Sequence, residues 1–153
     1  MKITSTFFML LMSAIVYSQS YDIYVSDAGN FDKPPWQILK YDQQGKNPIV
    51  FINTHLNWPQ DILFMEGSNT VLISNLGSGT ITKHHATTGV YVSDFTKEIS
   101  GPTRIKIGPD GLLYVLQWSG NGSVLRFDLE GNNMGEFTKV GVPQSIGLDW
   151  DCH

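Results

Sequence analysis

The stretch GPTRIKIGPDGLLYVLQWSGNGSVLRFDLEGN, from Gly101 to Asn132, decides the fold of this chain. Within this stretch, Gly108-Pro109-Asp110-Gly111 is typical of a hairpin turn, because proline presets φ and glycine accepts the positive φ that closes the turn. Three short runs rich in β-branched and aromatic residues lie around this turn and the next: Arg104–Gly108, Leu112–Gln117 and Ser123–Asp128. We expect each run to form a β-strand, and a fourth strand to follow around Gly135–Val140.

The same pattern recurs along the chain about every 42 residues. A Pro-x-x-Ile segment begins at Pro59, Pro102 and Pro143, with spacings of 43 and 41 residues. A second set of equivalent residues precedes a glycine in each unit: Tyr41-Asp42 before Gly45, His84-His85 before Gly89, and Phe127-Asp128 before Gly131. Four short strands in a repeat of this length are typical of β-propellers, in which small sheets stack around a central axis.

We therefore predict an all-β fold, a β-propeller with about three four-stranded blades of an incomplete ring and the first strand of a fourth. The blades are expected at residues 21–56, 57–99 and 100–142, with the next beginning at 143–153. Helical hairpins of similar period are excluded, because β-branched runs between glycine turns disfavour long helices. We expect an N-terminal fragment of a longer ring, with closure by dimerisation as the alternative.

The N-terminal residues have the pattern of a signal peptide, predicted at 1–18. Lys2 is followed by an uncharged apolar run from Phe7 to Val16, and Val16 and Ser18 stand at the −3 and −1 positions of a cleavage site. A retained membrane anchor is the alternative, but a spanning helix needs about 20 apolar residues and this run has about half that number. The mature chain, 19–153, is therefore expected to be a secreted or periplasmic partial β-propeller.

The charge balance excludes several classes of partner. Once Lys2 is removed with the leader, nine basic and 14 acidic residues remain, and the basic ones are scattered. A nucleic-acid groove needs a basic stripe, and an anionic membrane surface needs a basic cluster, so neither partner is expected, nor is membrane insertion after leader removal. Cys152 is the only cysteine, which indicates a free thiol or a disulfide partner elsewhere in a longer chain.

The segment Gly101–Asn132 resembles a blade of the NHL-repeat and SMP-30/gluconolactonase-like β-propellers, a superfamily that includes the streptogramin-lyase-like proteins. The resemblance covers most of residues 21–153 and implies a ligand site at one mouth of the central channel. Lactonases of the SMP-30 type carry a metal-binding glutamate in a Glu-Gly-Pro-like segment. That glutamate is missing from all three pre-proline positions of this chain: Asn57-Trp58, Ser100-Gly101 and Gly141-Val142.

Equivalent repeat positions define two rings of polar residues at the mouth that this resemblance implies. One ring precedes the isoleucine of each repeat and the other ends the next strand; the predicted ligand-binding residues are Asp61, Arg104, Ser145, Asp27, Asn75 and Gln117. Carboxylates mixed with amides suit hydrogen bonds to a sugar-like ligand or a hard cation such as Ca²⁺, the one candidate cofactor. The alternative is that these groups solvate the mouth and cap strand ends.

Histidines are the remaining candidates for metal chemistry. His84 and His85 are neighbours on a predicted strand and so point to opposite faces, which prevents both from binding one ion. His84 occupies the aromatic position of the repeat and is expected to pack in the core, and His85 is expected at the surface. For a lyase, these two and Glu66 are the nearby candidates; catalytic residues are not assigned, and no metal ligand is predicted.

The function that these observations favour is an exported β-propeller module that binds a small molecule, a carbohydrate or a protein partner at the channel mouth without catalysis. The alternative is a metal-dependent lactonase-type hydrolase or a related lyase of the SMP-30/streptogramin-lyase-like group, which the resemblance implies. Dependence on a divalent cation distinguishes the two hypotheses.

Overall fold

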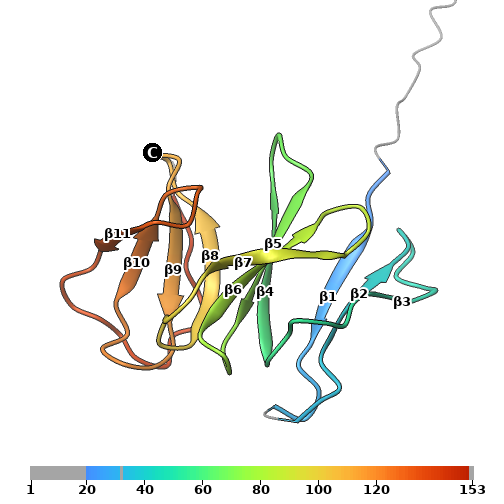
Figure 1. The fold of residues 1–153 in the computed structure, drawn as a ribbon, viewed down its shortest axis with the longest axis horizontal. Helices are drawn as coiled ribbons and strands as arrows, with labels where there is room; N and C mark the ends of the chain where they lie inside the picture. The colour runs from blue at the N-terminus through green and yellow to red at the C-terminus, as the bar shows by residue number, and fades with distance from the viewer. Residues whose placement is uncertain (1–19, 32, 152–153) are drawn as a thin grey trace, which may run out of the picture.

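The computed structural model describes residues 20–31 and 33–151. The predicted signal peptide, 1–18, and Cys152 lie outside the described residues. In the described part, eleven strands form three antiparallel sheets that follow one another across the molecule (Figure 1). Among these residues, no helix is long and apolar enough to cross a membrane. The predicted all-β class is confirmed.

Each sheet is a meander in which strands adjacent in sequence are adjacent in space. Sheet I contains β1 (Ile23–Asp27), β2 (Gln37–Tyr41) and β3 (Ile49–Ile52). Sheet II contains β4 (Pro59–Met65), β5 (Thr70–Asn75), β6 (Thr80–His85) and β7 (Tyr91–Thr96). Sheet III contains β8 (Pro102–Ile107), β9 (Leu113–Gln117), β10 (Val124–Phe127) and β11 (Asn133–Glu136).

The strand registers show that the three sheets share one plan. The aromatic position of each repeat pairs with an aliphatic residue on the preceding strand: Tyr41 with Ile23, His84 with Val71, and Phe127 with Leu113. The repeat prolines also pair alike, Pro59 with Asn75 and Pro102 with Gln117. Strands β1, β5 and β9 are therefore equivalent, and β4 and β8 hold the same place in sheets II and III. We call β4 and β8 the inner strands.

Three details differ from the sequence-based prediction. Sheet I has three strands in the described part of the chain, because β1 has no inner strand beside it. The expected first strand of a fourth unit is not formed, since residues 143–151 have no neighbouring strand with which to pair. The last strand of sheet III lies at Asn133–Glu136, a few residues before the predicted Gly135–Val140, because the chain turns directly after Asp128.

Apolar side chains fill the spaces between successive sheets. Alternate residues of β5 face opposite ways: Val71 and Ile73 pack with Ile38 of sheet I, whereas Leu72 packs with Ile105 of sheet III. The buried residues of sheets II and III include Leu72, Ile73, Ile105, Tyr114, Val115 and Phe127. Ile62 and Leu125 are partly buried against these clusters.

A glycine at an equivalent turn allows neighbouring sheets to approach closely. A Cβ atom on Gly89 would lie 2.0 Å from the carbonyl oxygen of Phe51 in sheet I. A Cβ atom on Gly131 would lie 2.1 Å from the carbonyl oxygen of Phe95 in sheet II. Both glycines also have positive φ, +72° and +94°. The turn after β6 is therefore in close contact with β3 of the preceding sheet, and the turn after β10 is in close contact with β7.

We expect Gly89→Ala and Gly131→Ala each to lower the free energy of unfolding by about 3 kcal/mol, because left-handed strain of about 1 kcal/mol adds to a clash with a backbone carbonyl. Gly67→Ala is the matched control, since Gly67 has φ of +70° and no described atom within 4 Å of its Cβ position. Gly67→Ala should lower the free energy of unfolding by the left-handed strain alone, about 1 kcal/mol. Urea denaturation of the three variants measures the difference, and equal costs would contradict the close contact.

Candidate functional site

The inner strands and residues 147–149 line an open groove of about 710 Å³. Charged and aliphatic side chains from three successive repeats form its walls: Asp61, Leu63, Arg104, Lys106, Leu148 and Asp149. Residues two apart on a strand share a face, which is why Arg104 and Lys106 of β8 both contribute. Two of the six predicted ligand-binding residues, Asp61 and Arg104, are thereby brought together in this groove.

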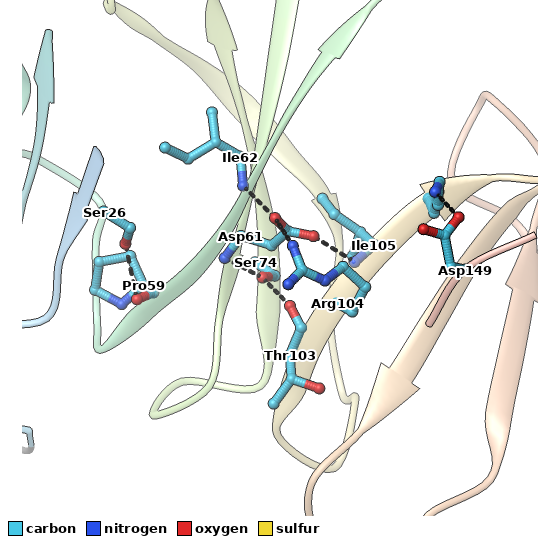
Figure 2. A network of polar contacts seen from close by, with 10 residues as sticks. Ser26, Pro59, Asp61, Ile62, Ser74, Thr103, Arg104, Ile105 and Asp149 are labelled. Atoms are coloured by element: carbon cyan, nitrogen blue, oxygen red, sulfur yellow. Dashed lines mark hydrogen bonds and ion pairs between the residues drawn. The ribbon is translucent and has the colours of Figure 1, made fainter. Parts of the chain in front are cut away.

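Asp61 joins the two inner strands. Its Oδ1 accepts a hydrogen bond from Arg104 Nη1 at 2.9 Å, and its Oδ2 accepts one from the Ile105 N–H at 2.9 Å (Figure 2). The Asp61 side chain is 13% exposed, whereas the Arg104 side chain is 45% exposed. Both carboxylate oxygens are therefore engaged within the protein, and part of the Arg104 guanidinium remains open to the groove.

A second ion pair, which was not predicted from the sequence, lines the other side of the groove. Lys106 Nζ contacts Asp149 Oδ1. This hydrogen bond and one from the Trp150 N–H lower the pKa of the Asp149 carboxyl, so it is ionised at neutral pH. The signal that could have identified Lys106 is the two-residue strand period, which places it on the same face as Arg104.

Hydroxyl groups hold successive repeats together beside the groove. Ser26 Oγ donates to the Pro59 carbonyl at 2.9 Å, and Ser74 Oγ donates to the Thr103 carbonyl at 2.6 Å (Figure 2). Thr103 Oγ1 donates in turn to the Ser145 carbonyl at 3.0 Å. Ser145, a predicted ligand-binding residue, uses its own hydroxyl to donate to the Val142 carbonyl at 2.7 Å.

The second predicted ring lies apart from the groove. Asn75 and Gln117 are buried, and each side-chain oxygen accepts a backbone N–H of the loop before the repeat proline, from Asn57 and Ser100 respectively. Asp27 accepts hydrogen bonds from Gln37 Nε2 and the Gly29 N–H, which lower the pKa of its carboxyl. In these contacts the three side chains cap strand ends and loops; their ligand role stays a prediction.

His84 and His85 lie as the repeat pattern predicts. His84 is fully buried; its Nδ1 lies 3.1 Å from the Gly89 carbonyl and its Nε2 lies 3.1 Å from Thr82 Oγ1. Burial lowers the pKa of His84, which favours the neutral ring. His85 is partly exposed and pairs with Asn69. Within the described residues, no group of three or more histidine, cysteine, aspartate or glutamate side chains could hold a metal ion.

Comparison with known proteins identifies the fold. No protein-family model and no curated protein matches this chain. Among solved structures, a chain of a nidogen/laminin complex matches with a TM-score of 0.63 and 20% identity over 76% of this chain and 42% of that chain. A structure described as a putative gluconolactonase matches with a TM-score of 0.61 and 16% identity, covering 81% of this chain and 45% of its own.

A gluconolactonase from Xanthomonas campestris matches similarly, with a TM-score of 0.62 and 17% identity over 81% of this chain and 46% of that one. The chain therefore spans less than half the length of each of these structures. It has the β-propeller fold, and sheets I to III are arranged as successive blades. At this level of identity, the comparisons define the fold alone.

The lowered pKa of His84 predicts a pH-dependent stability. An unfolded histidine titrates near its ordinary pKa of 6.5, whereas the buried ring resists protonation. Stability should therefore be greatest above pH 6.5 and fall as the pH is lowered through the pKa of the folded state. His84→Phe, which places in sheet II the residue found at this position in sheet III, should reduce this loss. Urea denaturation at pH 5 and pH 8 measures it.

His85→Gln serves as the control, because this side chain is partly exposed. It should keep the pH dependence of the unmodified chain. An unchanged dependence in His84→Phe would assign the acid sensitivity to another group.

Proposed function

We propose that this chain is an exported β-propeller module that binds a ligand or a protein partner at the groove without catalysing a reaction. The observation that carries the proposal is the combination of partly exposed charges, from Arg104, Lys106 and Asp149, with the aliphatic side chains of Leu63 and Leu148 in one hollow. Concave sites with a few polar groups among apolar ones are the usual ligand sites of proteins.

The charges of the groove indicate the kind of ligand. Two cations and two carboxylates are paired there, so the groove has no strong net charge. The Lys106–Asp149 pair is exposed, and an exposed ion pair contributes little to stability, so a ligand can displace one partner at small cost. A carboxylate on a ligand can therefore bind Arg104 or Lys106 while its carbon skeleton contacts Leu148. A sugar acid, or a peptide with an acidic side chain, fits this description.

The absence of a reactive group supports binding over catalysis. The lining of the groove, within the described part of the chain, contains no histidine, cysteine, serine or glutamate. Both of its aspartates are engaged, Asp61 by Arg104 and Asp149 by Lys106. A nucleophile or general base needs an available, activated side chain, and both carboxylates of the groove are paired with cations in this arrangement.

A metal-dependent lactonase is the second candidate. Its support is the fold that 81% of the chain shares with two proteins described as gluconolactonases, one of them as putative. Against it stand the missing glutamate before each repeat proline and the absence of a metal-binding cluster among the described residues. The second candidate therefore rests on the likeness in fold.

For the binding function, we expect thermal-shift screening of sugar acids and short acidic peptides to raise the melting temperature of the chain. The shift should be lost in Arg104→Ala/Lys106→Ala and kept in Lys97→Ala, a matched control whose ion pair with Asp94 lies outside the groove. Turnover of δ-gluconolactone should be absent with and without millimolar Ca²⁺ or Zn²⁺. Metal-dependent turnover would favour the lactonase, and a shift unaffected by the groove substitutions would place binding elsewhere.

Export is supported by the N-terminal pattern of Lys2, the apolar run Phe7–Val16 and the small residue Ser18. We expect the chain, expressed with its own N-terminus in a secreting host, to appear in the medium or periplasm with Gln19 as its first residue. Arg in place of Leu11, at the centre of the apolar run, should block this processing, because a charge there opposes insertion. N-terminal sequencing measures the cleavage site, and an intact Met1 on a membrane-bound product would identify a retained anchor instead.

A further inference from the structure

A second pocket, separate from the groove, lies between sheets II and III. It has a volume of about 210 Å³ and shares no lining residue with the groove. Its side chains come from β4 to β7 and from the turn after β10: Met65, Thr70, Leu72, Lys83, Phe95 and Leu129. Glu66 and Ser68, in the turn between β4 and β5, complete the lining. The pocket is therefore built by two four-stranded sheets, and all of its lining lies within residues 65–129.

Close packing of the two sheets fixes the apolar part of this pocket. Leu72 and Phe95 are 0% and 7% exposed and belong to the buried cluster that joins the sheets, against which Met65 is partly buried. The turn that carries Leu129 also carries Gly131, whose Cβ position lies 2.1 Å from the Phe95 carbonyl oxygen. That contact holds the turn against sheet II, so an apolar ligand meets side chains that are already in place.

Lys83 brings a positive charge to these apolar side chains. It pairs with Leu72 in the register of β5 and β6, so both side chains lie on the face of sheet II that packs against sheet III. Lys83 Nζ lies 5.5 Å from the centre of the Phe95 ring, close enough for a cation–π contact. In the described part of the chain, no ion pair joins Lys83 to a carboxylate. The ring holds this lysine in position, and its charge remains available to an anion.

Sheet I shows how a carboxylate fits beside the equivalent lysine. The two lysines hold the same place in their sheets: Lys40 pairs with Tyr24 of β1, and Lys83 pairs with the equivalent residue of β5. Lys40 Nζ lies 5.8 Å from the centre of the Tyr24 ring and 2.7 Å from Asp22 Oδ2. Sheet I therefore contains both the cation and the carboxylate with which it pairs.

Sheet II has a threonine where sheet I has that aspartate. Ile23 and Val71 are equivalent in the strand registers. Asp22 stands directly before the first of them, and Thr70 stands directly before the second. Because a threonine hydroxyl bears no charge, sheet II keeps the lysine but has no carboxylate at this position. Thr70 contributes a hydroxyl to the lining of the pocket instead.

From this comparison we infer that the pocket binds a small apolar monocarboxylate, whose carboxylate takes beside Lys83 the place that Asp22 has beside Lys40. The hydroxyls of Thr70 and Ser68 in the lining offer further hydrogen bonds to the carboxylate oxygens. A charged hydrogen bond is stronger where apolar side chains exclude water, and the buried cluster beneath the pocket provides that surrounding.

The volume of the pocket limits the size of the ligand. Pockets for drug-sized ligands have volumes of about 300 to 1,000 Å³. A pocket of about 210 Å³ therefore takes a single ring or a short branched chain, which would lie against Phe95 and Leu129.

Glu66 favours a ligand with only one negative charge. This residue is exposed in the turn between β4 and β5 and belongs to the lining of the pocket. Its carboxylate repels a second anionic group on the ligand. A dicarboxylate should therefore bind more weakly than the monocarboxylate of the same skeleton.

Benzoate is the probe for the whole chain, followed by NMR spectra of the methionine and leucine methyl groups. Increasing benzoate should shift the signals of Met65 and Leu129 along a saturating curve, and the signal of Leu148 reports the groove separately. Benzamide, the neutral isostere, should bind at least tenfold more weakly because it lacks the charge, and terephthalate should also bind more weakly than benzoate. Equal binding of benzoate and benzamide, or no shift of the Met65 and Leu129 signals, would overturn the inference.

Substitutions at the lysine and the threonine test the ion pair. Lys83→Met keeps an unbranched side chain over Phe95 and removes the charge, so it should raise the dissociation constant for benzoate at least tenfold. Thr70→Asp gives sheet II the carboxylate of sheet I, which should pair with Lys83 and weaken benzoate binding to the same degree. Thr70→Asn is the matched neutral control and should change the dissociation constant less than threefold. Unchanged benzoate binding in Thr70→Asp would refute the position of the ligand carboxylate, and the comparison with benzamide does not depend on the folding of any variant.

Two further variants separate the pocket from the groove. Glu66→Gln should lower the dissociation constant for benzoate about threefold, because it removes a like charge from the lining. An increase in the dissociation constant would contradict this arrangement of charges. Arg104→Ala/Lys106→Ala should leave the shifts of Met65 and Leu129 unchanged, and their loss would place the benzoate in the groove. Because the pocket and the groove are followed by different signals, this inference and the proposed function can fail separately.

Discussion

The structure depends on how closely each sheet can approach the next. A sheet of four short strands has two apolar faces and cannot cover either of them alone, so its stability comes from stacking. The stacking distance is set where the Gly89 and Gly131 turns touch a carbonyl of the preceding sheet. Any side chain at those turns would separate the sheets and reduce the contact between the buried clusters on either side.

The same stacking creates the groove. Because β4 and β8 are held at a fixed spacing, Asp61 reaches the backbone N–H of Ile105 and the side chain of Arg104 at once. The Ser74 hydroxyl of β5 bridges the same two sheets, and the Ser26 hydroxyl of β1 makes the corresponding contact between sheets I and II. The groove is therefore a product of blade packing, and its charges are positioned by backbone contacts that do not require a ligand.

The sequence predicted the sheets well because their signals are local. Glycine turns, β-branched runs and the repeat of Pro-x-x-Ile depend on short stretches of chain, and the paired registers of Tyr41, His84 and Phe127 confirm the alignment. The first strand of a fourth unit, expected within residues 143–153, is not formed in the described part of that range for a physical reason: a strand needs a neighbour with which to pair, and propensity does not supply one. The three-stranded sheet I has the same origin.

The candidate site was harder to predict, because a polar residue at a strand end can either face a ligand site or accept hydrogen bonds from a nearby loop. Asn75 and Gln117 look like mouth residues in the sequence, but their amides satisfy buried loop N–H groups. Lys106 escaped notice because the equivalent residues, Leu63 and Gly147, are apolar or lack a side chain. Only the spatial arrangement shows that it faces Asp149.

This contrast suggests where function is encoded in a repeat protein. Residues that recur between units, such as the turn glycines and the prolines Pro59, Pro102 and Pro143, maintain the fold and say little about a ligand. The positions that line the same groove but differ between repeats can carry different chemical groups: Asp61 and Arg104 in one row, and Leu63, Lys106 and Gly147 in the next. In a propeller, non-identical copies of one strand line a groove, so the positions that depart from the repeat decide which chemical groups face it. The paired charges of this chain lie at such positions.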